Sequence, residues 1–318
     1  MLVKGKRSWV RTLISAIIVA AIFFSMGRSL YRSWGQVRQQ VSTLHFHWLV
    51  LVLPFLCFAV CFAISAYGWK RVLRQFGEQV SFRKAVQIIA YSLFGKYLPG
   101  KVWAALGRMY LAKEAGVQER HAALSIIVET AYQLVSALAL FVFSLFFYPG
   151  LLARTYLLLL LIPVTLVMLV PPVFNRLVNF MLRFLKQKPV AYQTSLGQAL
   201  VIFLLYLAAW LVQGVGLYLL VLSIRPIGIK ALLILPGAFS LSWIVGFIVI
   251  FAPGGLGVRE GLFAILLNPI VPGALNIIVS LLSRLWITVG EILVFVFVFV
   301  FARLRRNNVK QETTGTQA

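Results

Sequence analysis

Long apolar runs recur from residue 12 to residue 302 of this 318-residue chain, and they constrain its fold more than any other feature. A helix of about 20 apolar residues is long enough to cross the hydrocarbon core of a bilayer. Hydrophobic residues also make up 61 % of the sequence, well above the share in soluble proteins. The runs therefore predict an all-α, polytopic membrane protein.

The lengths of the runs predict about six to eight transmembrane helices. We expect six crossings at about 12–27, 48–67, 121–148, 152–173, 197–222 and 273–302. The region 231–271 adds either no crossing, as a hairpin entered from outside, or two. No polar stretch is long enough to fold alone, so residues 1–306 are expected to form a single transmembrane domain. The polar residues 307–318 are expected to form a disordered cytoplasmic tail.

The charge balance is strongly basic, with 30 Lys and Arg residues against seven acids and a net charge of +23. Most of this charge lies in short loops beside the apolar runs, which indicates membrane topology and attraction to anionic lipid rather than nucleic-acid binding. The basic loops 70–84 and 175–188 and both chain termini are predicted to be cytoplasmic, so the inner (cytoplasmic) membrane is the expected location. Three His and no Asp argue against a metal site, and no motif predicts a cofactor.

Two similar short sequences interrupt apolar segments in the two halves of the chain, Tyr97-Leu-Pro-Gly100 and Phe251-Ala-Pro-Gly254. A continuous helix through either is disfavoured because Pro lacks an N–H and Gly lacks a Cβ. An ordinary interfacial loop is one interpretation. We favour two re-entrant segments related by an inverted repeat, because paired interruptions of this kind mark transporter binding sites. The residues expected to act as hinges or to line a cavity are Pro99, Gly100, Pro253, Gly254, Gly255 and Gly257.

Charged residues inside the apolar segments are the candidate substrate-binding residues. They are Lys101, Arg108, Glu129, Arg259, Glu260, Arg284 and Glu291. These charges could simply pair and hold helices together. The cations outnumber the acids, however, and Arg suits bidentate contacts with phosphate, so we expect an anionic ligand. Adjacent helical residues point to different sides, which makes Arg284 or Lys101 a better partner for Glu260 than Arg259.

At these residues the chain resembles the flippase-like membrane family that includes the transmembrane half of lysylphosphatidylglycerol synthases. The likeness covers about residues 10–303 and is carried by Lys96-Tyr-Leu-Pro-Gly-Lys-Val-Trp103 with Arg108, by Glu129, and by Pro253-Gly-Gly-Leu-Gly-Val-Arg-Glu260. It implies an inner-membrane protein with re-entrant helices that moves lipids or lipid-linked sugars between leaflets. Many members have an acid shortly after the first Pro-Gly, where this chain has Val102-Trp-Ala-Ala-Leu106.

These observations predict a lipid flippase or transporter for an anionic or amphipathic headgroup. The cations would contact phosphate, and Glu129, Glu260 and Glu291 would serve as counter-ions or proton carriers. Two alternatives remain: a membrane-embedded transferase that uses a lipid-phosphate donor, and a non-transporting partner of a lipid- or glycan-modifying enzyme. No nucleophile–base motif is present, which favours a transporter over an enzyme.

Overall fold

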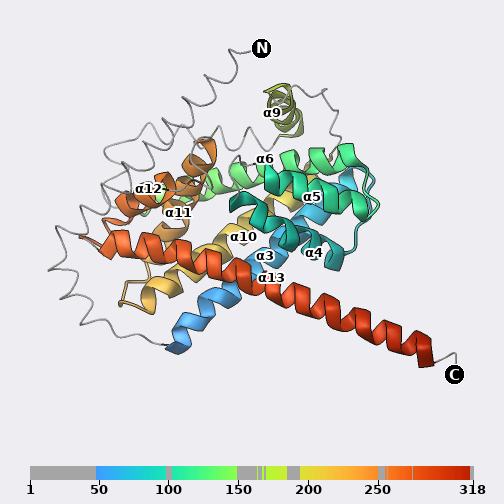
Figure 1. Ribbon diagram of the computed structural model, residues 1–318. Helices are drawn as coiled ribbons and strands as arrows, with labels where there is room; N and C mark the ends of the chain where they lie inside the picture. The colour runs from blue at the N-terminus through green and yellow to red at the C-terminus, as the bar shows by residue number, and fades with distance from the viewer. Residues whose placement is uncertain are drawn as a thin grey trace, which may run out of the picture.

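The computed structural model describes residues 48–97, 102–148, 163, 167, 170–184, 194–249, 255, 257–273 and 275–315. Across these residues the chain forms nine α-helices and one 3-10 helix, which confirms the all-α prediction (Figure 1). Five of these helices are long and apolar enough to cross a membrane. The predicted span 12–27 and most of the predicted span 152–173 lie outside the described residues.

The five candidate spans are α3 (Trp48–Gln75), α6 (Glu119–Leu145), α10 (Leu196–Leu222), α11 (Ala231–Ile248) and α13 (Leu275–Gly315), the last apolar as far as Arg305. Four of the five lie close to predicted crossings, and the fifth, α11, falls in the region 231–271, which was expected to add either no crossing or two. The start of α10 is fixed by a capping box in which Ser195 Oγ accepts from Gln198 N–H and the Gln198 side chain accepts from Ser195 N–H. Such reciprocal bonds satisfy backbone donors at a helix start.

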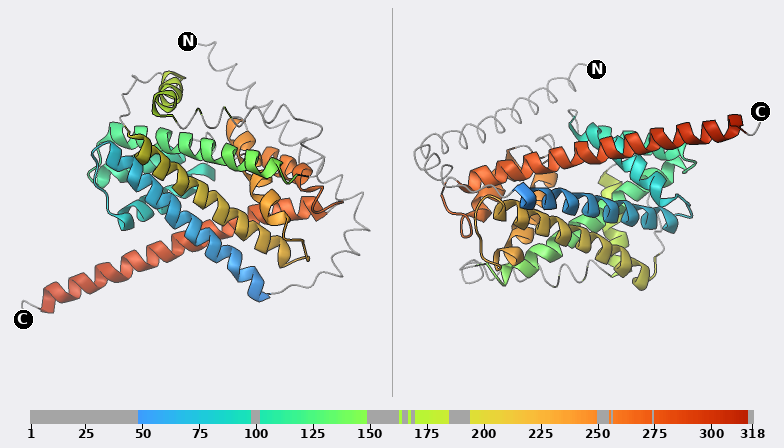
Figure 2. Two further views of the ribbon diagram at one scale, coloured as in Figure 1. Left: turned by 180° about the vertical axis from the view of Figure 1, so that it is seen from behind. Right: turned by 90° about the horizontal axis from the view of Figure 1, so that it is seen from below.

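Two helices run further than predicted. The segment 70–75, expected in a cytoplasmic loop, completes α3 and carries Lys70, Arg71 and Arg74 on its last turns. Lys and Arg are good helix formers, and cations suit the negative end of the helix dipole. Residues 307–315, expected in a disordered tail, continue α13. Because of this length, the C-terminal part of α13 projects beyond the other helices (Figures 1 and 2).

The four remaining α-helices and the 3-10 helix are too short to span a bilayer. Helix α4 (Phe82–Ser92), the 3-10 helix η1 (Leu93–Tyr97) and α5 (Trp103–Glu114) form a helical hairpin between α3 and α6. At its base, Glu78 Oε1 accepts from Gln118 N–H at 3.1 Å and lies 2.7 Å from His121 Nδ1. The hairpin therefore starts and ends at the same place.

Helix α9 (Pro171–Phe184) lies partly in the segment 175–188, which was expected to be a basic loop. Two prolines open it, where their missing N–H groups have no helical partner to lose. Phe174, Val178 and Leu182, four residues apart, are buried in one face, and α9 packs against α6.

The helices enclose three apolar clusters rather than one central core. The largest joins α6, α10, α11, α12 (Val258–Leu267) and α13, the second joins α6, α9 and α10, and the third holds the hairpin against α3. Large apolar side chains also cover the outer faces of α3, α10 and α13, including Leu56, Leu204 and Phe297. Such extensive exposed apolar surface is expected where lipid is the surrounding medium.

Candidate functional site

The start of α12 follows the second interruption of the apolar segments and is built by glycine. Gly255 and Gly257 have φ of +72° and +80°, a backbone region that favours glycine. A Cβ on Gly255 would lie 3.1 Å from Gly246 Cα, so α11 and the segment before α12 approach at backbone distance. Gly257 N–H donates to Glu260 Oε2 at 2.7 Å, which caps the helix with a buried carboxylate.

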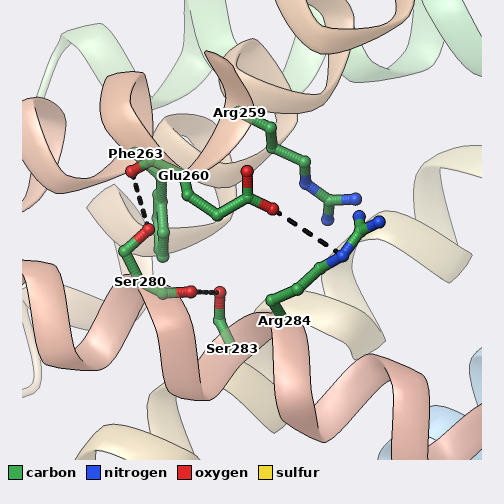
Figure 3. Close-up of a pocket in the computed structure, with 6 residues that line it drawn as sticks. All are labelled: Arg259, Glu260, Phe263, Ser280, Ser283 and Arg284. Carbon is green, nitrogen blue, oxygen red and sulfur yellow. Dashed lines mark hydrogen bonds and ion pairs between the residues drawn. The ribbon is translucent and has the colours of Figure 1, made fainter. Parts of the chain in front are cut away.

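The other carboxylate oxygen of Glu260 faces α13. Glu260 Oε1 lies 3.7 Å from Arg284 Nε, and Ser280 Oγ donates to the Glu260 backbone carbonyl at 2.7 Å (Figure 3). The predicted pairing of Glu260 with Arg284 is therefore present. Glu260 exposes only 4 % of its side chain and Arg284 17 %, so the ion pair is largely removed from solvent.

Arg259 and Lys96 bring two further cations to this place. The Arg259 side chain turns toward the Arg284 guanidinium (Figure 3), and its Cζ lies 4.5 Å from the centre of the Phe239 ring. This geometry is a cation–π contact. Lys96 of η1 forms an ion pair with Glu291 of α13. Its ammonium group also interacts electrostatically with the guanidinium groups of Arg284 and Arg259. We call Lys96, Arg259 and Arg284 the cation cluster.

The cation cluster unites three segments that are far apart in the sequence: the tip of the hairpin, the start of α12 and the middle of α13. With Glu260 and Glu291, the five side chains carry three positive and two negative formal charges, a net charge of +1. The pocket beside them holds about 170 Å³ of empty space, in gaps narrower than a water molecule. Arg259, Glu260, Phe263, Ser280, Ser283 and Arg284 line it (Figure 3). The space among these six side chains is thus charged and too narrow for a headgroup.

A second buried ion pair attaches α5 to α6. Arg108 Nη1 lies 2.6 Å from Glu129 Oε2, and the Arg108 Cζ lies 4.1 Å from the centre of the Trp69 ring. Trp69 is fixed in turn because its indole N–H donates to Ser125 Oγ at 2.9 Å. Within the described part of the chain, Arg108 Nε and Nη2 are buried without a hydrogen-bond partner. Unsatisfied buried donors are costly, so this guanidinium retains capacity to bind an acceptor.

The family model described as "Lysylphosphatidylglycerol synthase TM region" matches residues 8–306, which is nearly the whole chain. The chain belongs to this family. No curated protein matches it. The resemblance seen in the sequence is therefore confirmed, and the chain is a multi-pass membrane protein of the lysylphosphatidylglycerol synthase TM-region family.

In this member of the lysylphosphatidylglycerol synthase TM-region family, the structure divides the predicted site residues into two groups. Arg259, Glu260, Arg284 and Glu291 gather at the cation cluster, whereas Arg108 and Glu129 pair between α5 and α6. The predicted residues Lys101, Pro99, Gly100, Pro253 and Gly254 lie outside the described residues. The roles assigned to all of these residues stay predictions.

The predicted site residues did not include three side chains that the structure places in direct contact with them. Lys96 pairs with Glu291, Trp69 lies under Arg108, and Phe239 lies under Arg259. For Lys96 a signal existed, because it lies beside the first Pro-Gly and carries a charge next to an apolar run. The two aromatic residues gave no signal, because aromatic residues are frequent throughout these runs.

Proposed function

We propose that this protein moves an anionic or amphipathic lipid, or a lipid-linked sugar, between the leaflets of the cytoplasmic membrane. In this proposal it acts as a transporter rather than an enzyme, and both termini lie in the cytoplasm. The observation that carries the proposal is the meeting of three cations from η1, α12 and α13 beside two carboxylates. A net positive site at membrane depth favours an anionic ligand.

Phosphate is the headgroup part that suits this site best. Arginine presents several N–H donors in one plane and binds phosphate through two parallel hydrogen bonds. Arg259 and Arg284 direct their guanidinium groups toward a common region (Figure 3), and Lys96 adds a third charge near them.

Two short elements, α12 and the hairpin α4–η1–α5, support alternating access to the site. Helix α12 has ten residues, which correspond to about 15 Å of helix, or half of the hydrocarbon thickness. The hairpin α4–η1–α5 starts and ends at one place. Both features support re-entrant segments that meet inside the membrane. Since the space among these side chains is too narrow for a headgroup, the proposal requires the hairpin or α12 to move when a headgroup enters.

The alternatives predict different behaviour. A transferase that uses a lipid-phosphate donor needs a carboxylate positioned for proton transfer, and the buried carboxylates Glu129, Glu260 and Glu291 each face a basic side chain. A non-transporting partner of a lipid- or glycan-modifying enzyme would need neither the buried cations nor the buried carboxylates. We therefore place transport first, with membrane lipids as the partners that the protein binds.

A leaflet-resolved lipid assay in proteoliposomes tests this proposal. Arg259→Gln and Arg284→Gln should each reduce transport of an anionic fluorescent phospholipid at least tenfold, while the purified variants remain folded in the membrane. Arg225→Gln is the matched control, because this exposed Arg lies in the link between α10 and α11 and should leave transport unchanged. Wild-type transport by both cluster variants would refute the proposed site.

A further inference from the structure

A second pocket lies where α3 ends and α4 begins. It has a volume of about 260 Å³ and is lined by Lys70, Arg74, Glu78, Gln79, Val80 and Ser81. None of these residues belongs to the cation cluster or to the Arg108–Glu129 pair. Unlike the closed space beside the cation cluster, this pocket has room for a phosphate group.

The charges around this pocket favour an anion. Lys70 and Arg74 are four residues apart on α3 and so lie on one face of the helix. Among the described residues neither has a carboxylate within ion-pair distance, and Lys70 Nζ lies 5.9 Å from the Tyr67 ring centre. The one acid in the lining, Glu78, already accepts from Gln118 N–H and lies beside His121. Its Oε1 is therefore engaged, and Lys70 and Arg74 give the lining two positive charges against this one negative charge.

The depth of the pocket favours a lipid as the source of the anion. The candidate membrane span of α3 ends at Gln75, so Lys70, Arg74 and the following residues lie at the level of a span's end. Tyr67 and Phe82 flank this corner as an exposed edge-to-face pair with ring centres 6.2 Å apart. Exposed aromatic residues beside basic ones are typical of the headgroup level of a bilayer.

We propose that the pocket between α3 and α4 binds the phosphodiester of an anionic phospholipid headgroup, with Lys70 and Arg74 as its ligands. This is a binding site at the membrane surface, separate from the proposed transport site and independent of whether the protein transports lipid. Bound there, the lipid lies beside the first turn of α4, where the hairpin begins.

The test uses the full-length protein in micelles of a neutral detergent. Binding of dioctanoyl phosphatidylglycerol, dioctanoyl phosphatidylcholine and inorganic phosphate is measured by native mass spectrometry. We expect the Lys70→Gln/Arg74→Gln double variant to bind phosphatidylglycerol at least tenfold more weakly than the wild type. The matched control is Arg225→Gln/Lys230→Gln, which removes the same charge from the exposed link between α10 and α11 and should bind as the wild type does.

A further variant keeps both cations. Gln79→Glu adds a carboxylate to the pocket lining and should weaken binding of phosphatidylglycerol to a similar degree, without altering the melting temperature of the lipid-free protein. Equal binding by the wild type and the Lys70/Arg74 double variant would overturn the proposal, as would an equal loss in the control. If inorganic phosphate binds as tightly as phosphatidylglycerol and depends on the same residues, the lipid assignment is wrong and the site takes a free anion.

Discussion

The ion pair of Glu260 with Arg284 has two proposed roles, in the stability of the fold and in ligand binding. Replacing the two residues singly and together separates these roles. The Glu260 carboxylate has two contacts: Gly257 N–H at 2.7 Å and Arg284 Nε at 3.7 Å. Glu260→Gln retains a side-chain oxygen that can accept from Gly257 N–H. The variant therefore keeps the helix cap and loses mainly the charge that faces Arg284.

The magnitude follows from distance and burial. Two unit charges 3.7 Å apart attract with about 4 kcal/mol at an effective dielectric constant of about 20. Removing one member of a buried pair generally costs about 3–5 kcal/mol, because the remaining charge is left in the interior. Since Arg284 is 17 % exposed, we expect each single variant to lose about 3 kcal/mol. The double variant should be less destabilised than the sum of the two, by about 2 kcal/mol.

The free energy of unfolding is measured for Glu260→Gln, Arg284→Gln and the double variant in mixed micelles, and lipid transport is measured in proteoliposomes with the same preparations. We expect the double variant to lose less stability than the two single losses added together, and to have no transport, because the phosphate ligand Arg284 is missing in it. Additive losses of stability would refute the reasoning, since they would mean that Arg284 does not neutralise Glu260. Wild-type transport by the double variant would show that the pair is only structural.

Three further predictions test other parts of the structure. Gly95→Ala should lower stability by about 1–3 kcal/mol, because its Cβ would lie 2.5 Å from a backbone nitrogen of α5. Gly197→Ala is the control, because its Cβ would meet no atom within 4 Å, and thermal unfolding compares the two variants. Arg108→Lys keeps the charge but loses the planar contact with Trp69, and should cost about 1–2 kcal/mol in the same assay. Cysteines placed at positions 186 and 315 should resist a membrane-impermeant thiol reagent in intact cells; labelling of either would contradict cytoplasmic placement of both.

The sequence was sufficient to locate the long helices because bilayer thickness sets their length. The apolar run expected at 197–222 is α10, Leu196–Leu222, and the run expected at 121–148 is α6, Glu119–Leu145. The end of α3 was predicted too early because Lys70, Arg71 and Arg74 were interpreted as a loop. Basic residues mark the edge of a membrane, but they do not end a helix. Their positions therefore predict where a membrane span ends better than where its helix ends.

The site was predictable where geometry within one helix decided it. Adjacent residues diverge on a helix, which directed the search for the partner of Glu260 away from Arg259 and toward Arg284. The pairing of Lys96 with Glu291 could not be predicted in the same way, because these residues are 195 positions apart. It depends on how the hairpin packs against α13, and no local pattern in a single sequence records that packing.

The way the hairpin is attached connects the fold to the proposed function. Among the side chains of α5 only Ala112 is buried, so this half of the hairpin contributes little apolar packing. Arg108 with Glu129 adds a polar attachment of α5 to α6, and Glu78 joins the two ends of the hairpin at its base. At the tip, η1 contacts α13 through Lys96 with Glu291 and through the edge-to-face pair of Phe94 with Phe295. Apolar packing cannot be exchanged for a ligand, but an ion pair can, because a phosphate offers Lys96 the same kind of partner that Glu291 does. A headgroup that binds the cation cluster would therefore compete for one of the contacts that join the hairpin tip to α13, while the Phe94–Phe295 contact remains, which couples binding to movement of the tip.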